Sequence, residues 1–114
     1  MDNRDVRRVI AVSKTHLDVG YTDYAGAVLR RYVESFIPGA VDLAFSVNTS
    51  DKKRFVWTSG SYLVWYYLTH ADSAARARFL EAIRLGYVRY HALPVTTHTE
   101  LMSAELFSYG LSIA

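Results

Sequence analysis

The chain has no cysteine among its 114 residues. This absence excludes disulfide bonds, thiolate metal sites and a cysteine nucleophile, and it fits a reducing compartment. Long apolar runs are also lacking. The run nearest the N-terminus, Val9–Val12, is too short for the core of a signal peptide or for a membrane span. With Met1 at the start, we therefore expect a soluble, cytoplasmic protein with no membrane partner.

The chain also lacks a large excess of either charge, because it has thirteen basic and eleven acidic residues and a net charge of +2. The longest basic cluster is Lys52–Arg54, which lies between two predicted elements, and no nucleic-acid motif accompanies it. Such a cluster is more typical of a solvated turn, so we expect no nucleic-acid partner. Hydrophobic residues make up 51% of the chain, an ordinary proportion for one small globular domain.

Strands and helices are predicted to alternate along the chain. Short β-branched or aromatic runs predict strands, and apolar residues at helical spacing predict the helices between them. Pro38 is expected to end one helix and open the next, and Gly86 to end a later one. The predicted strands are 6–13, 54–58 and 88–93, and the predicted helices are 24–36, 38–45, 62–68, 73–85 and a last stretch from residue 100.

This alternation predicts an α/β fold with a parallel sheet. A sheet of only three parallel strands leaves both edges bare, whereas parallel strands are normally covered on both faces. We therefore expect a partial (β/α) barrel of three βα units. In this interpretation, residues 1–114 are the N-terminal part of a barrel domain whose remainder is missing.

The sharpest candidate for chemistry is the pair His16 and Asp18, directly after the first predicted strand. Residues two apart in extended backbone point to the same side. An imidazole beside a carboxylate, at the carboxyl end of a parallel strand, is half of a zinc-type site. Gly20 allows a sharp turn immediately afterwards. A hydrogen-bonded loop or a helix cap is the competing interpretation of this pair.

The segment Ser13–Thr22 resembles the opening motif of the family 38 glycoside hydrolases, the α-mannosidases, in which a strand ends in His-x-Asp-x-Gly-aromatic. The similarity continues through Arg54–Trp65 and, more loosely, through Phe79–Glu100. The resemblance implies a seven-stranded β/α barrel, of which this chain supplies three strands. It also implies a catalytic zinc with His16 and Asp18 as ligands, and a carbohydrate substrate that stacks on Tyr21.

The chain departs from the family after the third predicted strand. The family places its nucleophilic aspartate there, whereas this chain has Thr99, followed by Glu100. A threonine hydroxyl cannot replace a carboxylate in forming a glycosyl-enzyme intermediate. Three alternatives stay open: Glu100 is the nucleophile, His98 is a metal ligand in a His-x-Glu arrangement, or this branch uses inverting or other zinc-assisted chemistry. We favour a divergent branch that keeps the metal.

Two further side chains have competing interpretations. Trp57, at the end of the second predicted strand, is a candidate for the wall of a sugar cleft, although an aromatic side chain in a strand is more often part of the core. His91, inside the third predicted strand, is predicted to be a hydrogen-bonded core histidine.

One further zinc ligand would be His98 or Glu100, whereas another ligand and the acid that protonates the leaving group would lie outside these 114 residues. We therefore expect this chain alone to bind metal poorly and to cleave nothing. Two other functions remain open. One is a non-catalytic α/β domain that pairs with another chain through its sheet edges. The other is a metal-dependent polysaccharide deacetylase, whose related barrel also pairs His and Asp at a metal.

Overall fold

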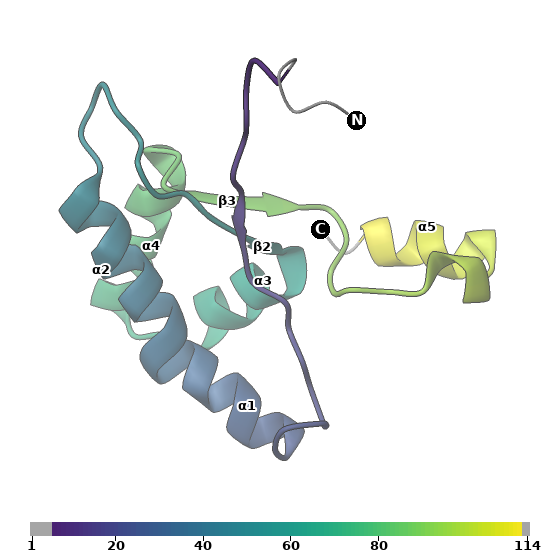
Figure 1. Ribbon diagram of the computed structural model, residues 1–114. Helices are drawn as coiled ribbons and strands as arrows, with labels where there is room; N and C mark the ends of the chain where they lie inside the picture. The colour runs from purple at the N-terminus through teal and green to yellow at the C-terminus, as the bar shows by residue number, and fades with distance from the viewer. Residues whose placement is uncertain (1–5, 113–114) are drawn as a thin grey trace.

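The computed structural model describes residues 6–112, in which strands and helices alternate as predicted (Figure 1). In chain order the elements are β1 (Ser13–Lys14), α1 (Ala25–Arg31), the π-helical turn η2 (Tyr32–Phe36), α2 (Ile37–Val47), β2 (Trp57–Gly60), α3 (Ser61–His70), α4 (Ser73–Arg84), β3 (Val88–His91), the 3₁₀ turn η3 (Thr99–Leu101) and α5 (Ala104–Ser112).

The three strands form one parallel sheet in the order β1-β2-β3. Ser13 lies opposite Trp57, Trp57 opposite Val88, and Gly60 opposite His91. The predicted α/β class and the parallel sheet are therefore confirmed. The sheet is open, so closure into a barrel would need strands beyond these three.

The first strand is much shorter than predicted. Residues 6–12 run in extended form before β1 but pair with nothing among the described residues, because β2 begins only at Trp57, opposite Ser13. Their apolar side chains are exposed, from 60% for Val6 to 83% for Val9. The prediction that this run is buried on both faces is therefore wrong for the chain as it stands.

The second strand begins three residues later than predicted because the Asn48 side chain forms hydrogen bonds with the backbone of the residues before it. The Asn48 side-chain oxygen accepts hydrogen bonds from the backbone N–H groups of Arg54 and Phe55, at 2.7 and 2.9 Å. Its side-chain nitrogen donates to the Phe55 carbonyl oxygen at 2.7 Å. These bonds hold residues 54–55 in a loop, and β2 pairs with its neighbouring strands only from Trp57 onward.

The predicted helix break at Pro38 does not occur, because α1, η2 and α2 follow one another without interruption from residue 25 to residue 47. Pro38 lies in the first turn of α2, and the wider π-helical turn η2 comes directly before it. A proline ring in a regular α-helix clashes with the carbonyl group four residues earlier, here that of Glu34. The π-helical turn relieves that clash.

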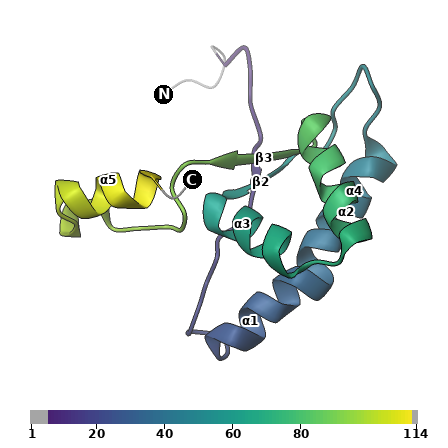
Figure 2. The same cartoon turned by 180° about the vertical axis from the view of Figure 1, so that it is seen from behind.

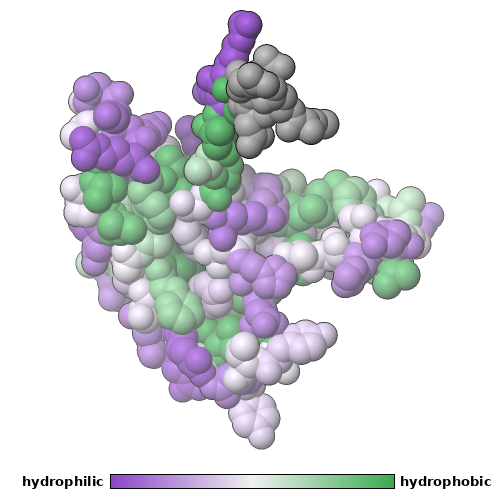
Figure 3. Space-filling model, viewed as in Figure 1, coloured by the Kyte–Doolittle hydropathy of each residue, from purple (hydrophilic) through white to green (hydrophobic). Residues whose placement is uncertain are grey.

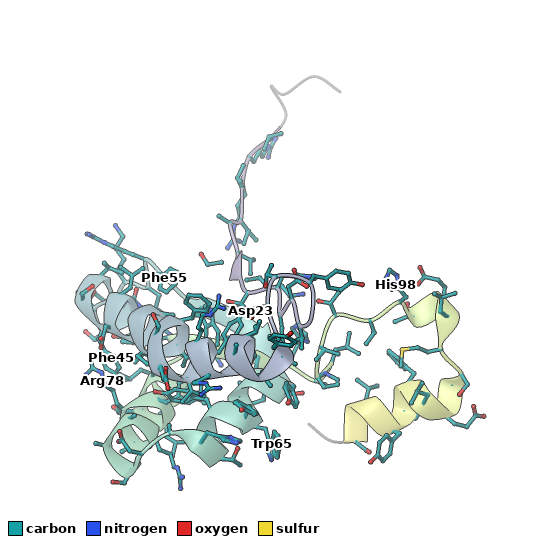
Figure 4. The ribbon with its side chains drawn as sticks, turned by 90° about the horizontal axis from the view of Figure 1, so that it is seen from below. Asp23, Phe45, Phe55, Trp65, Arg78 and His98 are labelled. Carbon is teal, nitrogen blue, oxygen red and sulfur yellow. The ribbon has the colours of Figure 1, made fainter. Side chains whose placement is uncertain are left out.

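The hydrophobic core joins the first four α-helices to one face of the sheet. Figures 1 and 2 show α2, α3 and α4 grouped around β2 and β3, with α5 standing apart. The Phe79 side chain is fully buried, and its ring lies 4.7 Å from the ring of Tyr67 and 6.5 Å from that of Trp57. At the rim, Arg78 of α4 bonds Asp42 of α2 at 2.8 Å and covers the Phe45 ring (Figure 4).

A second apolar surface lies on α5, which has no buried residue. Leu106 and Tyr109 are 54% and 66% exposed. Figure 3 shows apolar surface both on this helix and on the extended residues before β1. None of the helices within residues 6–112 has the length and apolar character needed to cross a membrane.

Gly60 is the glycine at which an added methyl group is expected to cost most. A Cβ there would stand 2.5 Å from the carbonyl oxygen of Pro94, which accepts a hydrogen bond from the Tyr62 N–H in the first turn of α3. We expect Gly60→Ala to lower the free energy of unfolding by about 1–3 kcal/mol, measured by urea denaturation. Gly39→Ala in α2, where nothing lies within 4 Å, should instead be stabilising by about 0.5–1 kcal/mol. Equal effects would contradict the close approach of Pro94.

Candidate functional site

The candidate site lies at the carboxyl end of the parallel sheet. Residues 15–18 follow β1, β2 ends at Gly60, and β3 ends at His91. Because the strands are parallel, these three ends lie at the same edge, where α/β proteins place their chemistry. The predicted pair His16 and Asp18 belongs to the first of these ends.

The alternation of side chains places His16 away from the core. Thr15 lies on the helix-covered side, because its hydroxyl oxygen accepts a 2.6 Å hydrogen bond from Nε1 of the buried Trp57. Leu17 packs against the core cluster on that same side. His16 stands between them and is exposed, and Asp18 is half-buried. The predicted imidazole is thus accessible at the carboxyl end of β1.

Two contacts fix the backbone and ring of His16. Nδ1 of His16 lies 3.3 Å from Oγ1 of Thr96, in the loop after β3. The His16 carbonyl oxygen accepts a 3.3 Å hydrogen bond from the hydroxyl group of Tyr32 in η2. With Nδ1 held by Thr96, Nε2 is the nitrogen left for a ligand, which is the usual way a hydrogen bond orients a metal-binding histidine.

Sequence reasoning missed the role of Tyr32, since its place in an apolar helical stripe predicts only packing. Burial raises the pKa of Tyr32, and the nearby Asp18 carboxylate raises this pKa further. Tyr32 therefore lies close to both members of the predicted pair. The π-helical turn that begins at Tyr32 has no clear sequence pattern.

Replacing Tyr32 by phenylalanine should change how stability depends on pH. The raised pKa keeps folded Tyr32 protonated at pH values where the unfolded chain has lost this proton, so stability falls as pH rises above about 10. Tyr32→Phe should make that fall shallower in urea denaturation between about pH 8 and 11. Tyr67, whose pKa burial also raises, should preserve part of the fall. The control is Tyr109→Phe on α5. A fall in Tyr32→Phe as steep as in the control would exclude this role.

Tyr21 follows a glycine turn, as predicted. Gly20 has a φ of +90°, and the Tyr21 side chain beyond it is 92% exposed. Its ring is thus free to stack on a ligand. Residues 20–25 line a hollow of about 330 Å³. Within it, Asp23 is engaged with Arg31 and accepts a 2.8 Å hydrogen bond from the Tyr24 N–H, so its carboxylate fixes the start of α1.

Trp57, the second expected sugar contact, lies in the core. Its side chain is 5% exposed, packs against the Phe79 ring, and donates its Nε1 proton to Thr15. A ring buried in this way offers no face to a sugar in this chain. Its contribution to the site is indirect, since it holds Thr15, the residue directly before His16.

His98 and Glu100 lie on the exposed segment between β3 and α5. His98 Nδ1 lies 4.0 Å from Oε1 of Glu100, and the two side chains are 82% and 73% exposed. Figure 4 shows His98 on the segment that leads to α5, apart from Asp23 and α1. Across residues 6–112, no three His, Asp or Glu side chains lie close enough together to hold a metal. The structure therefore brings Thr96 to His16, but it does not add His98 or Glu100 to a common ligand group.

His91 is predicted to be a hydrogen-bonded core histidine. It is half-buried at the end of β3, and its Nε2 atom is inaccessible to solvent and has no hydrogen-bond partner among the described residues. That His91 is a hydrogen-bonded core histidine therefore stays a prediction.

No family model, curated protein or solved structure matches this chain.

Proposed function

We propose that these residues form part of a zinc-dependent glycoside hydrolase of the α-mannosidase type. In this proposal the three βα units belong to a seven-stranded β/α barrel, and further strands complete both the sheet and the site. The observation that carries the proposal is the placement of His16 and Asp18. Both follow β1 at the carboxyl end of a parallel sheet, and the His16 ring is exposed and oriented by Thr96.

The uncovered face of the sheet supports the barrel. Core helices cover the face that carries Trp57 and Ser59, whereas Thr58 lies on the other face, between its strand partners Lys14 and Arg89. Both of these cationic side chains are exposed. In a β/α barrel, helices cover the outer face and strands enclose the inner one. Residues 6–12 would then extend β1 against a neighbouring strand, which would bury their apolar side chains.

The donor atoms at the site fit zinc in kind but are too few. An imidazole and a carboxylate are common zinc ligands, and a catalytic site usually has three protein ligands and one open position. His16 Nε2 and the Asp18 carboxylate would supply two of these ligands. Bound there, zinc would hold sugar hydroxyl groups and stabilise charge as the glycosidic bond breaks.

The other residues of the chain have supporting parts in this mechanism. Thr96 orients the His16 ring, and Tyr32 holds the backbone beneath it. Tyr21 offers an exposed ring on which a sugar would stack. Glu100 is the candidate nucleophile and His98 the candidate third ligand, and both depend on the segment after β3 moving toward His16 when the barrel is complete.

The product of the complete reading frame that encodes these residues is the right protein for the test. We expect it to release nitrophenol from a nitrophenyl α-mannoside, to lose this activity with a zinc chelator, and to regain it with added zinc. The 114-residue chain should release none. Acetate release from acetylated sugars, without glycoside cleavage, would replace the proposal with the deacetylase.

A non-catalytic interaction domain is the second candidate, and the exposed apolar side chains of residues 6–12 and α5 favour it. In that case His16 and Asp18 would only stabilise the loop after β1. Replacing both by alanine distinguishes the two functions. A site should lose activity with little change in stability, whereas a structural role should cost about 1–3 kcal/mol of unfolding free energy.

A further inference from the structure

Two cationic side chains meet at the amino end of the sheet, the end opposite His16. A Cβ added to Gly86 would lie 2.7 Å from Nζ of Lys53 and 2.8 Å from a guanidinium nitrogen of Arg89, so both cationic groups lie close to one point. Lys53 precedes β2, and Arg89 is the second residue of β3. Figures 1 and 2 show the segment before β2 beside the C-terminal end of α4. The fold thus brings together two cations that are far apart in the sequence.

Neither cation has a partner of opposite charge among residues 6–112. The ion pairs there join other side chains, and neither Nζ of Lys53 nor the Arg89 guanidinium donates a hydrogen bond to a described residue. Both side chains are exposed. Like charges this close repel each other unless an anion lies beside them. The pair therefore indicates a negatively charged occupant.

The carboxyl end of α4 accounts for only part of this arrangement. The last carbonyl groups of a helix carry partial negative charge, which attracts cations. Three of these carbonyl groups, those of residues 81–83, already accept hydrogen bonds from the backbone N–H groups of residues 85–87. The helix end therefore attracts Lys53 and Arg89 without forming a hydrogen bond with either side chain.

Lys53 also borders a hollow that is large enough for a small anion. Its volume is about 290 Å³, and it lies between residues 11–13 and the segment before β2. Arg54 and Thr58 line the same hollow and add a third cation and a hydroxyl group, and no carboxylate is among the described residues that line it. Thr58 is the strand partner of Arg89, so Arg89 stands next to this hollow on the uncovered face of the sheet.

We propose that Lys53 and Arg89 form a binding site for a phosphate group, with Arg54 and Thr58 at its rim. The ligand is inorganic phosphate or a small phosphate monoester. A phosphate dianion matches two cations, whereas a single carboxylate would leave one of them unpaired. Arginine binds phosphate oxygens through two parallel hydrogen bonds, and lysine binds them as a point charge. The site lies at the opposite end of the sheet from the proposed zinc site and does not depend on the proposed function.

The test is a titration of the 114-residue chain with inorganic phosphate at constant ionic strength, followed by NMR of the lysine Cε and arginine Cζ signals. We expect the signals of Lys53 and Arg89 to shift together and to saturate, while those of Lys52 stay still. Methyl phosphate should bind more tightly at about pH 8 than at about pH 5, because its second pKa is about 6. Tighter binding of methyl phosphate than of inorganic phosphate would assign the group to an ester, and the reverse would assign it to the free ion.

Matched variants separate a built site from general charge attraction. Lys53→Gln and Arg89→Gln should each weaken phosphate binding at least about tenfold, since each removes a charged hydrogen-bond donor. Lys52→Gln removes the same charge from a neighbouring residue that does not line the hollow, so it should change the affinity less than about twofold. Arg89→Lys should retain more affinity than Arg89→Gln. Because Lys53 is exposed before β2, Lys53→Gln keeps the test decisive if Arg89→Gln does not fold.

Four results would overturn the inference. The first is the absence of a saturable shift at Lys53 and Arg89. The second is an equal loss of affinity in Lys52→Gln and Lys53→Gln, which would reduce the binding to attraction by net charge. The third is tighter binding, per phosphate group, of a short DNA duplex than of methyl phosphate, which would replace the small ligand by nucleic acid. If Lys53→Gln lowers Tm without any effect on phosphate binding, the two cations serve only the carboxyl end of α4.

Discussion

Replacing Phe79 by alanine is expected to lower the free energy of unfolding by about 3–5 kcal/mol, the usual cost of removing a buried phenylalanine ring. The Phe79 side chain is 0% exposed and contacts the rings of Trp57 in β2 and Tyr67 in α3. Its loss would leave a cavity where α3, α4 and the sheet meet. Domains of this size have a total stability of about 5–15 kcal/mol, so the variant should be near the limit of folding.

The control for this experiment is Leu80→Ala, one residue further along the same helix. The Leu80 side chain is 48% exposed, so its removal should cost less than about 1 kcal/mol. Urea denaturation followed by tryptophan fluorescence measures both variants. Similar losses in the two would show that Phe79 is not at the centre of the core, and the described packing of β2 against the helices would be wrong.

Replacing His16 by alanine is expected to abolish the zinc affinity of the chain while leaving its stability almost unchanged. Loss of a residue that only orients a ligand costs about 10–100-fold in affinity, and loss of the ligand itself costs more. Since the proposal assigns only two well-placed protein ligands to this chain, its own affinity should be weak at the outset. His16 is exposed, so His16→Ala should change the unfolding free energy by less than about 0.5 kcal/mol.

Asp18→Ala should have the same effect on zinc, and His70→Ala should have none. A competition titration with a chromophoric chelator measures all three variants against the parent chain. An unchanged zinc affinity in His16→Ala would exclude this histidine as a ligand. A large loss of stability in the same variant would instead favour the interpretation in which the pair only braces the loop.

The order of the elements was predictable from the sequence because each has a local cause. The α4 helix illustrates this. Asp72 caps its start, accepting a 2.9 Å hydrogen bond from the Ala75 N–H, and Gly86 follows its end with a φ of +71°. Such short-range effects are visible in the residues themselves. The parallel sheet then follows from the alternation of strands and helices.

The boundaries and the environment of the site were not predictable, because they depend on contacts between distant residues. Asn48 shortens β2 from the far side of a loop, and the π-helical turn brings Tyr32 under His16. By sequence alone, Trp57 is a candidate for a sugar cleft, although an aromatic side chain in a strand is more often part of a core. Only the packing of Phe79 against it decides the matter.

The contact of Thr96 with His16 at the candidate site was likewise not predictable from the sequence. Nothing in the sequence indicates that a threonine 80 residues after His16 meets its ring, or that the loop after β3 crosses over Gly60. The sequence motif predicted that His16 and Asp18 follow β1. The neighbours that orient them come from the loop after β3 and from η2, whose positions are set by the whole fold.

The most direct test of the central claim is a zinc titration that follows the Nε2 signal of His16 and the carboxylate carbon of Asp18 by NMR. If His16 and Asp18 bind one zinc ion, both signals move together and saturate at the same zinc concentration, while the signals of His70 stay still. Zinc binding by this pair is contradicted if neither signal moves, if the two respond at different zinc concentrations, or if zinc binds His98 and Glu100 instead.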